Sequence, residues 1–310
     1  MRCSLSFATL FFVVSSLATA NGYVNCGATV TYLGHVPEDR RLVVVGMGAI
    51  TPVGRTAGAT WDNIRDGKNG IGRITLFPEV ERLPVSIAGE IPGFRFGPPN
   101  QYGFLKRSAA MSRTHQFAVV AAVEAAREAG ILAGAPGQWS VQHDPFRTGV
   151  FVGSTQGETA GVPAAALELQ RQLDDRTAAS ALAVPDVQLA LKGLPGMVQG
   201  HVSMALGAKG PSSCPSAACA SGAQAIALAG TMIIGGFADV MVAGGADSHL
   251  TPIDITARHA LGILSTRNDA PERASRPWDA ERDGFVLGEG AAVVVVTSER
   301  YAREHRLPVK

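Results

Sequence analysis

The order of the predicted elements indicates an α/β fold in which helices are layered on a largely parallel central sheet. Short runs of β-branched residues alternate along the chain with longer segments of helical periodicity. Many runs end in glycine, and the 36 glycines gather at strand ends and turns. With 310 residues, 46% of them hydrophobic and 17% charged, the chain can build one large core or two smaller ones.

The first predicted strand, residues 41–48, is a run of valines that ends in glycine and is typical of a buried parallel strand. Its Gly46-Met-Gly48 end resembles the start of a dinucleotide-binding motif. The third glycine of that motif would fall at Thr51, and Pro52 follows. The spacing therefore argues against a nicotinamide site.

The later elements are predicted from apolar spacing and from the glycines that close each segment. The segment 220–234 is apolar nearly all round, which predicts a helix buried at the centre of the fold. In chain order we expect helices at 60–66, 112–129, 164–173, 220–234, 251–262 and 298–305, an apolar segment at 187–206, and strands at 148–152, 239–245 and 291–296.

The first 40 residues differ in kind from the rest. Met1-Arg2, an apolar run from Leu5 to Val14 and an Ala18-Thr-Ala20 site have the three parts of a secretory leader, so residues 1–20 are expected to be cleaved. The run is short for a membrane span. Residues 21–40 are interpreted as a linker or transit segment. An organelle reached by the secretory route, such as a plastid, is one destination, and a mitochondrion is the alternative.

Charge and cysteine usage exclude several classes of partner. The net charge is +1 and no long basic run occurs, which argues against nucleic acid. Cys3 and Cys26 lie in or beside the leader. Cys214 and Cys219 are five residues apart, which suits neither a disulfide framework nor a metal site, so no metal is predicted. Cys214 is expected to be an inert strand residue.

Cys219 is the strongest functional signal in the chain. The sequence Gly210-Pro-Ser-Ser-Cys-Pro-Ser-Ala-Ala-Cys219-Ala-Ser-Gly222 places it where a strand turns into the apolar helix. A helix N-terminus offers unpaired N–H groups and partial positive charge, and both favour a thiolate. A lone cysteine is usually a small buried hydrophobe, but this position predicts a nucleophile. Pro215, which cannot donate a ladder hydrogen bond, puts the local strand pairing in doubt.

Three further strings accompany the cysteine: Leu264-Ser-Thr-Arg-Asn-Asp269, Ser275-Arg-Pro-Trp-Asp279 and Arg282-Asp-Gly-Phe-Val-Leu-Gly-Glu-Gly-Ala291. Together they resemble the β-ketoacyl-(acyl-carrier-protein) synthases, the condensing enzymes of fatty-acid and polyketide synthesis. The resemblance implies a thiolase-like fold of two similar halves, each with a mixed five-stranded sheet layered with helices. Residues 41–310 would form the first half, and the second half would lie beyond Lys310.

The resemblance implies that Cys219 takes an acyl group from a thioester and that the acyl group is then condensed with a malonyl-carrier. No cofactor is expected, because phosphopantetheine arrives on the acyl carrier protein. A homodimer is also implied. Two alternatives stay open: a catalytically incomplete fragment or non-catalytic subunit, and a coenzyme A-dependent thiolase-like enzyme. The Pro277-Trp-Asp279 string argues against the latter.

The family's two catalytic histidines and lysine belong to its second half, so none of the seven histidines is assigned to catalysis. By the resemblance His201 would be structural, and His115 and His259 are expected at the surface or an interface. Asp283 and Glu289, although both carboxylates, are interpreted as parts of a structural hydrogen-bond network.

Four more residues are candidates for binding. By the resemblance Gln156 borders the acyl pocket, where a polar side chain would shorten or reshape the pocket, although a bond to its own backbone is an equal alternative. Arg258 departs from the family pattern and is assigned to substrate binding with Gln156. Lys106 and Arg107 are candidates for docking the acidic carrier, with a solvated basic face as the alternative.

Overall fold

The computed structural model describes residues 41–97, 110–135, 139–157, 159, 161–174, 186 and 188–310. The expected leader, the 21–40 segment, Lys106 and Arg107 lie outside the described residues. No helix in the described part of the chain has both the length and the apolar character needed to cross a bilayer.

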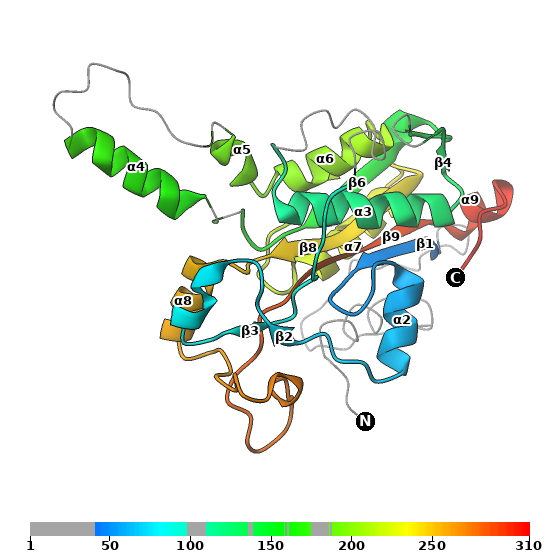
Figure 1. Ribbon diagram of the computed structural model, residues 1–310. Coiled ribbons are helices and arrows are strands. Elements are labelled where there is room, and N and C mark those ends of the chain that lie inside the picture. The colour runs from blue at the N-terminus through cyan, green and yellow to red at the C-terminus, as the bar shows by residue number, and fades with distance from the viewer. Residues whose placement is uncertain are drawn as a thin grey trace, which may run out of the picture.

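A five-stranded mixed sheet forms the centre of the molecule, in the order β1-β9-β8-β6-β7 (Figure 1). β7, β6 and β8 run parallel to one another, whereas β9 is antiparallel to both of its neighbours, β8 and β1. The strands are β1 (Leu42–Ile50), β6 (Thr148–Gly153), β7 (Ser212–Ser213), β8 (Val240–Ser248) and β9 (Glu289–Ser298).

The expectation that the first strand is parallel is wrong. β1 lies at an edge of the sheet and pairs antiparallel with β9, from Leu42 opposite Ser298 to Ile50 opposite Ala291. The register shifts between Val44 and Gly46. A run of valines fits a neighbour of either direction, so the direction depends on which distant strand lies beside it.

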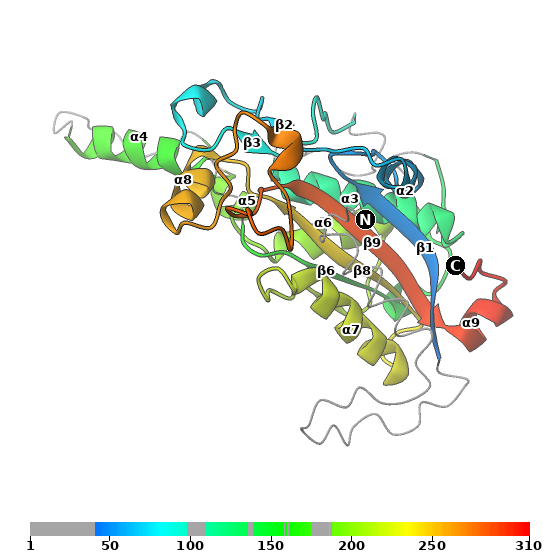
Figure 2. The same cartoon turned by 90° about the horizontal axis from the view of Figure 1, so that it is seen from below.

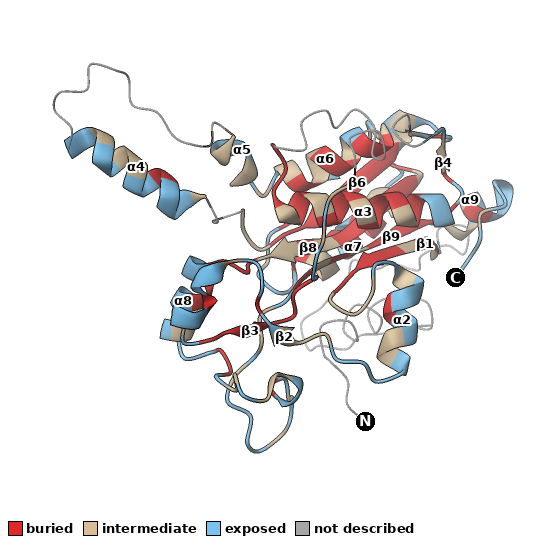
Figure 3. Cartoon of the chain, viewed as in Figure 1, coloured by how far each residue is buried: buried red, intermediate tan, exposed pale blue. Residues whose placement is uncertain are grey.

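Helices cover both faces of the sheet. α3 (Arg113–Glu128) and α6 (Met197–Leu206) share one core cluster with residues from one face of β1, β6, β8 and β9. α7 (Ser221–Ile234) packs on the opposite face, against residues such as Met241 and Val294 (Figure 2). Burial is densest where α3 meets the sheet (Figure 3).

The helix α7 is expected to be buried at the centre of the fold, and in this chain the side that faces the sheet is buried. Ala225, Ile226 and Ala229 face the sheet, whereas Ala227 and Leu228 are exposed. Exposure on this side is set by which elements lie over it, and an apolar sequence alone does not reveal that.

The N-terminus of α3 shows why the expectation that His115 lies at the surface or an interface is wrong. Ser112 caps the helix by accepting a hydrogen bond from the His115 backbone N–H, and His115 Nδ1 accepts one from the Ser112 N–H. His115 is 1% exposed and its ring lies 4.8 Å from that of His201, centroid to centroid. The position of His115 at a capping box draws it into the core, away from the expected surface. His201 is buried, in keeping with its structural interpretation.

The helix α4 (Val162–Asp174) projects from the body of the molecule in both views (Figures 1 and 2). The remaining helices follow the expected order, with the apolar segment 187–206 divided into α5 (Leu189–Lys192) and α6, whereas the short strand pairs and the 3-10 turns were not predicted. These elements are α2 (Ala57–Arg65), α4 (Val162–Asp174), α5 (Leu189–Lys192), α8 (Pro252–Ala260), α9 (Glu299–Glu304), the pairs β2 (Gly72–Arg73) with β3 (Ile87–Ala88) and β4 (Leu132–Ala133) with β5 (Ser140–Val141), and the 3-10 turns η2 (Pro78–Arg82), η5 (Pro145–Arg147) and η6 (Pro271–Arg273).

Candidate active site

The carboxyl ends of the three parallel strands meet at one edge of the sheet. β7 leads into the turn that holds Cys219, β6 leads into the loop 154–157, and β8 carries Asp247 at its end and is followed by His249. Ligands of open α/β sheets bind outside the carboxyl ends of such strands. The topology therefore brings three separate segments together at the place where a site is expected.

Cys219 lies in the turn between β7 and α7, as the sequence predicts, and it is exposed. The residue before it, Ala218, has φ +49°, a left-handed conformation that costs energy for any residue with a Cβ atom. The Ser221 hydroxyl donates to Ala218 O at 2.6 Å and accepts from the Ala217 N–H at 2.9 Å. The turn is thus held tightly around an accessible thiol at the start of a helix.

The first turn of α7 gives this place its electrostatic character. Ala220 makes no side-chain cap, and the helix begins at Ser221, two residues after Cys219. Helix N-termini carry unpaired N–H groups and partial positive charge. Negative charge that develops next to Cys219 is therefore favoured.

Cys214, expected to be an inert strand residue, lies just after β7 rather than within a strand. Burial raises the pKa of its thiol, the Ser154 N–H lowers it, and the charge of Asp247 raises it again. Pro215 also follows the paired part of β7, so it removes no ladder hydrogen bond. The doubt about strand pairing is resolved because β7 is paired only at Ser212 and Ser213.

The loop after β6 touches the cysteine turn at two points. A Cβ on Gly153 would lie 2.3 Å from Ser221 O, so only glycine allows β6 to approach the start of α7 this closely. In the loop that follows β6, the Thr155 carbonyl accepts a hydrogen bond of 3.2 Å from Ser216 Oγ. The conformation of the loop therefore bears on the conformation of the turn.

Gln156 and Arg258, which the sequence assigns to substrate binding, meet at one carboxylate. Gln156 Nε2 and Arg258 Nη1 each donate to Asp254 Oδ1 at 2.8 Å. Burial pushes the pKa of Asp254 upward, but donation from Thr159, Thr251, Arg258 and Gln156 holds it below its usual value. The alternative that Gln156 bonds its own backbone is not what the structure shows, and substrate contact by either residue stays a prediction.

Asp247 and His249 are the polar residues that the sequence analysis missed. Asp247 Oδ1 accepts from Ser154 Oγ at 2.8 Å and from the Thr155 N–H at 3.0 Å. His249 Nε2 lies 3.0 Å from the same carboxylate oxygen and 2.5 Å from Thr155 Oγ1. An Asp-x-His sequence at the end of a predicted strand was the available signal, but their partners come from a loop more than 90 residues earlier in the chain.

Residues 39–302 match the family model described as the N-terminal domain of β-ketoacyl synthase. The chain belongs to the β-ketoacyl synthase family. Two curated relatives are similar over most of this chain. The 3-oxoacyl-(acyl-carrier-protein) synthase 2 of Vibrio cholerae is 34% identical over 264 residues, which are 85% of this chain and 59% of the relative. Its namesake from Staphylococcus aureus is 36% identical over 262 residues, 84% of this chain and 58% of the relative.

Solved ketosynthases share the fold. A β-ketoacyl synthase from Burkholderia phymatum aligns with a TM-score of 0.72 and 29% identity, over 86% of this chain and 61% of that one. A second alignment is with a chain of a solved complex, a type II polyketide synthase acyl-carrier protein with its ketosynthase bound to the hexaketide. It has a TM-score of 0.68 and 26% identity and covers 87% of this chain and 61% of that one. The expected thiolase-like α/β class with a mixed five-stranded sheet is confirmed. The chain spans less than two thirds of the length of these relatives.

The two carboxylates of the Arg282–Gly290 string of this β-ketoacyl synthase chain have structural roles, as expected. Asp283 accepts hydrogen bonds from Ser265 Oγ and the Thr266 N–H. Glu289, whose side chain is fully buried, pairs with Arg113 at 2.6 Å. The two acids hold different segments and share no partner among the described residues, so they do not form an acid/base pair.

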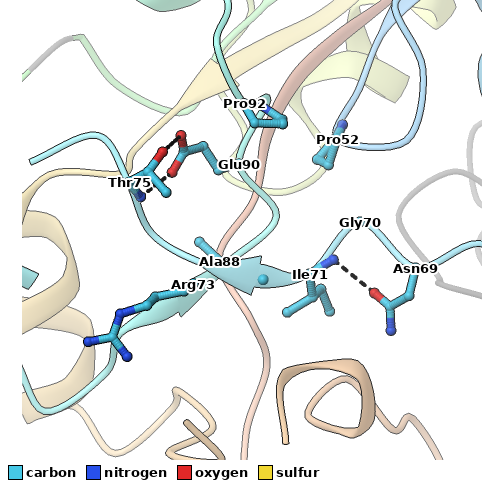
Figure 4. Close-up of a pocket in the computed structure, with 10 residues that line it drawn as sticks. Pro52, Asn69, Gly70, Ile71, Arg73, Thr75, Ala88, Glu90 and Pro92 are labelled. Carbon is cyan, nitrogen blue, oxygen red and sulfur yellow. Dashed lines mark hydrogen bonds between the residues drawn. The ribbon is translucent and has the colours of Figure 1, made fainter.

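A cavity of about 260 Å³ lies between the β2–β3 pair and the segment around Pro52 and Pro92 (Figure 4). Its Glu90 carboxylate accepts from the Thr75 N–H and hydroxyl, each at 2.6 Å. The Arg73 side chain pairs with Glu81. The charged groups are thus satisfied internally, and none of the lining residues belongs to the cysteine turn. Within the described ranges, no group of three or more His, Cys, Asp and Glu side chains is arranged to hold a metal ion.

Proposed function

We propose that the protein is a 3-oxoacyl-(acyl-carrier-protein) synthase in which Cys219 carries the growing acyl group. The observation that supports this most directly is an exposed cysteine on a strained turn at the start of α7. A soft nucleophile in such a place can take an acyl group from one thioester and hold it as another.

In the first step the Cys219 sulfur attacks the carbonyl carbon of the acyl thioester. A new C–S bond forms, the bond to the pantetheine sulfur breaks, and the pantetheine thiol leaves with the proton that the Cys219 thiol has lost. The oxyanion of the tetrahedral intermediate develops next to the first turn of α7. One well-placed backbone N–H donor there, which we assign to Cys219 itself, is worth about 3–4 kcal/mol.

In the second step a malonyl-carrier loses CO2, and its carbanion attacks the acyl carbon on Cys219. A C–C bond forms, the C–S bond to Cys219 breaks, and the thiolate is restored. The resemblance assigns this activation to two histidines and a lysine. We propose that they belong to the part of the relatives' length that this chain does not span.

The substrate delivery and assembly follow from the same proposal. The names of the relatives support acyl carrier protein, rather than coenzyme A, as the donor of the thioester. Phosphopantetheine would arrive on that carrier, so the chain would need no cofactor of its own, and Lys106 and Arg107 are proposed to contact the carrier. We also propose a homodimer, which sedimentation analysis of the full-length protein would test.

The location of the protein is a separate proposal. The leader-like residues 1–20 support import into an organelle through the secretory route, such as a plastid, with a mitochondrion as the alternative. A fluorescent fusion to the C-terminus of the full-length protein, compared with one that lacks residues 1–20, would distinguish these locations.

The acyl-enzyme step is tested by mass spectrometry of the full-length protein after incubation with acyl-carrier thioesters of several chain lengths. We expect one acyl adduct, on the peptide that holds Cys219, and its loss in Cys219→Ala. Cys214→Ala is the matched control and should keep the adduct. An adduct on Cys214, or none at all with any thioester, would contradict the proposal and favour the non-catalytic alternative.

A further inference from the structure

Thr155 is bound at all three of its polar groups. Its N–H donates to Asp247 Oδ1 at 3.0 Å. Its hydroxyl lies 3.1 Å from the same oxygen and 2.5 Å from His249 Nε2. Its carbonyl accepts from Ser216 Oγ, which belongs to the cysteine turn. Thr155 therefore connects the polar groups at the end of β8 to the segment that carries Cys219.

The hydrogen-bond directions in this connection are decided by chemistry. The amide nitrogen of Gln156 can only donate, so His249 Nδ1, 3.3 Å away, accepts from it. The proton of the imidazole is then on Nε2, which donates to Thr155 Oγ1. The Thr155 hydroxyl in turn donates to the carboxylate of Asp247, which can only accept.

The same amide group links His249 to α8. The second hydrogen of the Gln156 amide goes to Asp254 Oδ1 at 2.8 Å, so both of its donors are used. His249 is 7% exposed and thus largely shielded from water that would compete for these bonds. Its ring is held on one side by Gln156 and on the other by Thr155 and Asp247.

We propose that His249 is a positioning residue of the acyl-transfer site. It holds Thr155, and through the Thr155 carbonyl it fixes the Ser216 side of the turn that presents Cys219. This role rests on the proposed function for its consequence in acyl transfer. The fixed turn itself is a property that can be measured without any acyl donor.

Two substitutions distinguish the contacts of the two ring nitrogens of His249. In His249→Gln the side-chain amide nitrogen can take the place of Nε2 and donate to Thr155. In His249→Asn the shorter amide takes the place of Nδ1, and the link to Thr155 is lost.

We expect His249→Asn to slow acylation of Cys219 about tenfold, the effect of one hydrogen bond, and His249→Gln to recover most of that loss. His259→Asn is the matched control, since no hydrogen bond of the His259 side chain occurs among the described residues, and it should leave the rate unchanged.

The experiment measures two rates on the full-length protein. One is acyl transfer to Cys219 from an acyl-carrier thioester, and the other is alkylation of Cys219 by iodoacetamide, each followed by mass spectrometry. The thermal midpoint is recorded alongside, because each variant removes the contacts of one ring nitrogen: Nδ1 with Gln156 in His249→Gln, and Nε2 with Thr155 and Asp247 in His249→Asn. A merely structural role would slow each variant in step with its loss of thermal stability, whereas positioning slows acylation in His249→Asn beyond that loss.

A Thr155→Val background supplies the second test, because it removes the hydroxyl but keeps the backbone contacts. If His249 acts through Thr155, then His249→Asn should cause no further loss in that background. Equal rates in His249→Asn and wild type, or additive losses in the double variant, would overturn the inference. Slower alkylation of His249→Asn together with no acyl adduct in wild type would support the positioning role and sink the proposed function instead.

Discussion

At the scale of single residues, Glu289 joins three separate segments of the chain. Its buried carboxylate accepts from Arg113 Nε and Nη2, from the Ile91 N–H and from Ser248 Oγ. The Arg113 guanidinium also lies 5.0 Å from the centre of the Phe117 ring. The pair thus fixes the start of β9 against α3 and the end of β8. Breaking a buried ion pair is costly because the remaining charge has no partner.

We expect Glu289→Gln to lower the free energy of unfolding by about 3–5 kcal/mol, because Arg113 is left without its counter-charge. The measurement is urea unfolding at neutral pH. Glu304→Gln is the control, since its pair with Arg300 is exposed and should contribute less than about 1 kcal/mol. Similar losses of unfolding free energy in the two variants would show that the buried pair stabilises the fold no more than the exposed pair does.

At the scale of elements, β1 and α3 are in unusually close contact. A Cβ on Gly48 would lie 2.0 Å from Ala121 O, and one on Gly46 would lie 2.2 Å from Ala125 O. The Gly-x-Gly sequence that resembles a nucleotide loop therefore serves helix–strand packing. The close approach also lets Glu124 accept from the Ala49 N–H on the free edge of β1.

Gly48→Ala should force β1 away from α3, and we expect a loss of at least about 1–3 kcal/mol in the free energy of unfolding, typical of overpacking. Gly58→Ala in α2 is the matched control, because nothing lies within 4 Å of the added Cβ. A helical Gly-to-Ala change there should be neutral or stabilise by up to about 1 kcal/mol. Thermal denaturation of both variants decides the matter, and a harmless Gly48→Ala would refute the packing argument.

At the scale of the whole molecule, the layer of α3 and α6 over the sheet encloses two histidines. Burial, together with the charge of the neighbouring His201, lowers the pKa of His115 from its ordinary value of 6.5 to about 3. Burial lowers the pKa of His201 as well. The His115 ring is therefore neutral in the folded protein across mildly acidic pH, while the same residue in the unfolded chain takes up a proton.

This difference makes stability fall with acid. The folded pKa of His115 lies below the unfolded one, so its contribution is complete above pH 6.5 and is lost as the pH drops toward 3. Between pH 7.5 and 5.5 we expect His115 alone to remove about 1.4 kcal/mol from the free energy of unfolding. His115→Gln should reduce the pH dependence by that amount in urea titrations. Comparison of His115→Gln with wild type at pH 7.5 measures the loss of the capping contact alone. A variant with the same pH dependence of stability as wild type would contradict the assignment of that dependence to His115.

Much of the architecture follows from local patterns. The order of strands and helices, the cap that opens α3 and the turn at Cys219 arise from neighbours in sequence, such as the glycines after helices and the apolar run after the cysteine. Pairing direction is not local. β1 is antiparallel because β9, almost 250 residues later, lies beside it.

The sequence by itself determined the family and the succession of the long helices and strands, and it singled out Cys219 as the proposed nucleophile, because each rests on residues close together in the chain. Only the tertiary structure decided that Gln156 and Arg258 share Asp254, that His115 is buried and that His249 faces Thr155. The contacts of Gln156 and Thr155 join the segments that follow the parallel strands β6 and β8, which are far apart in sequence. Their partners are set by the order of strands in the sheet, which no local pattern of residues encodes.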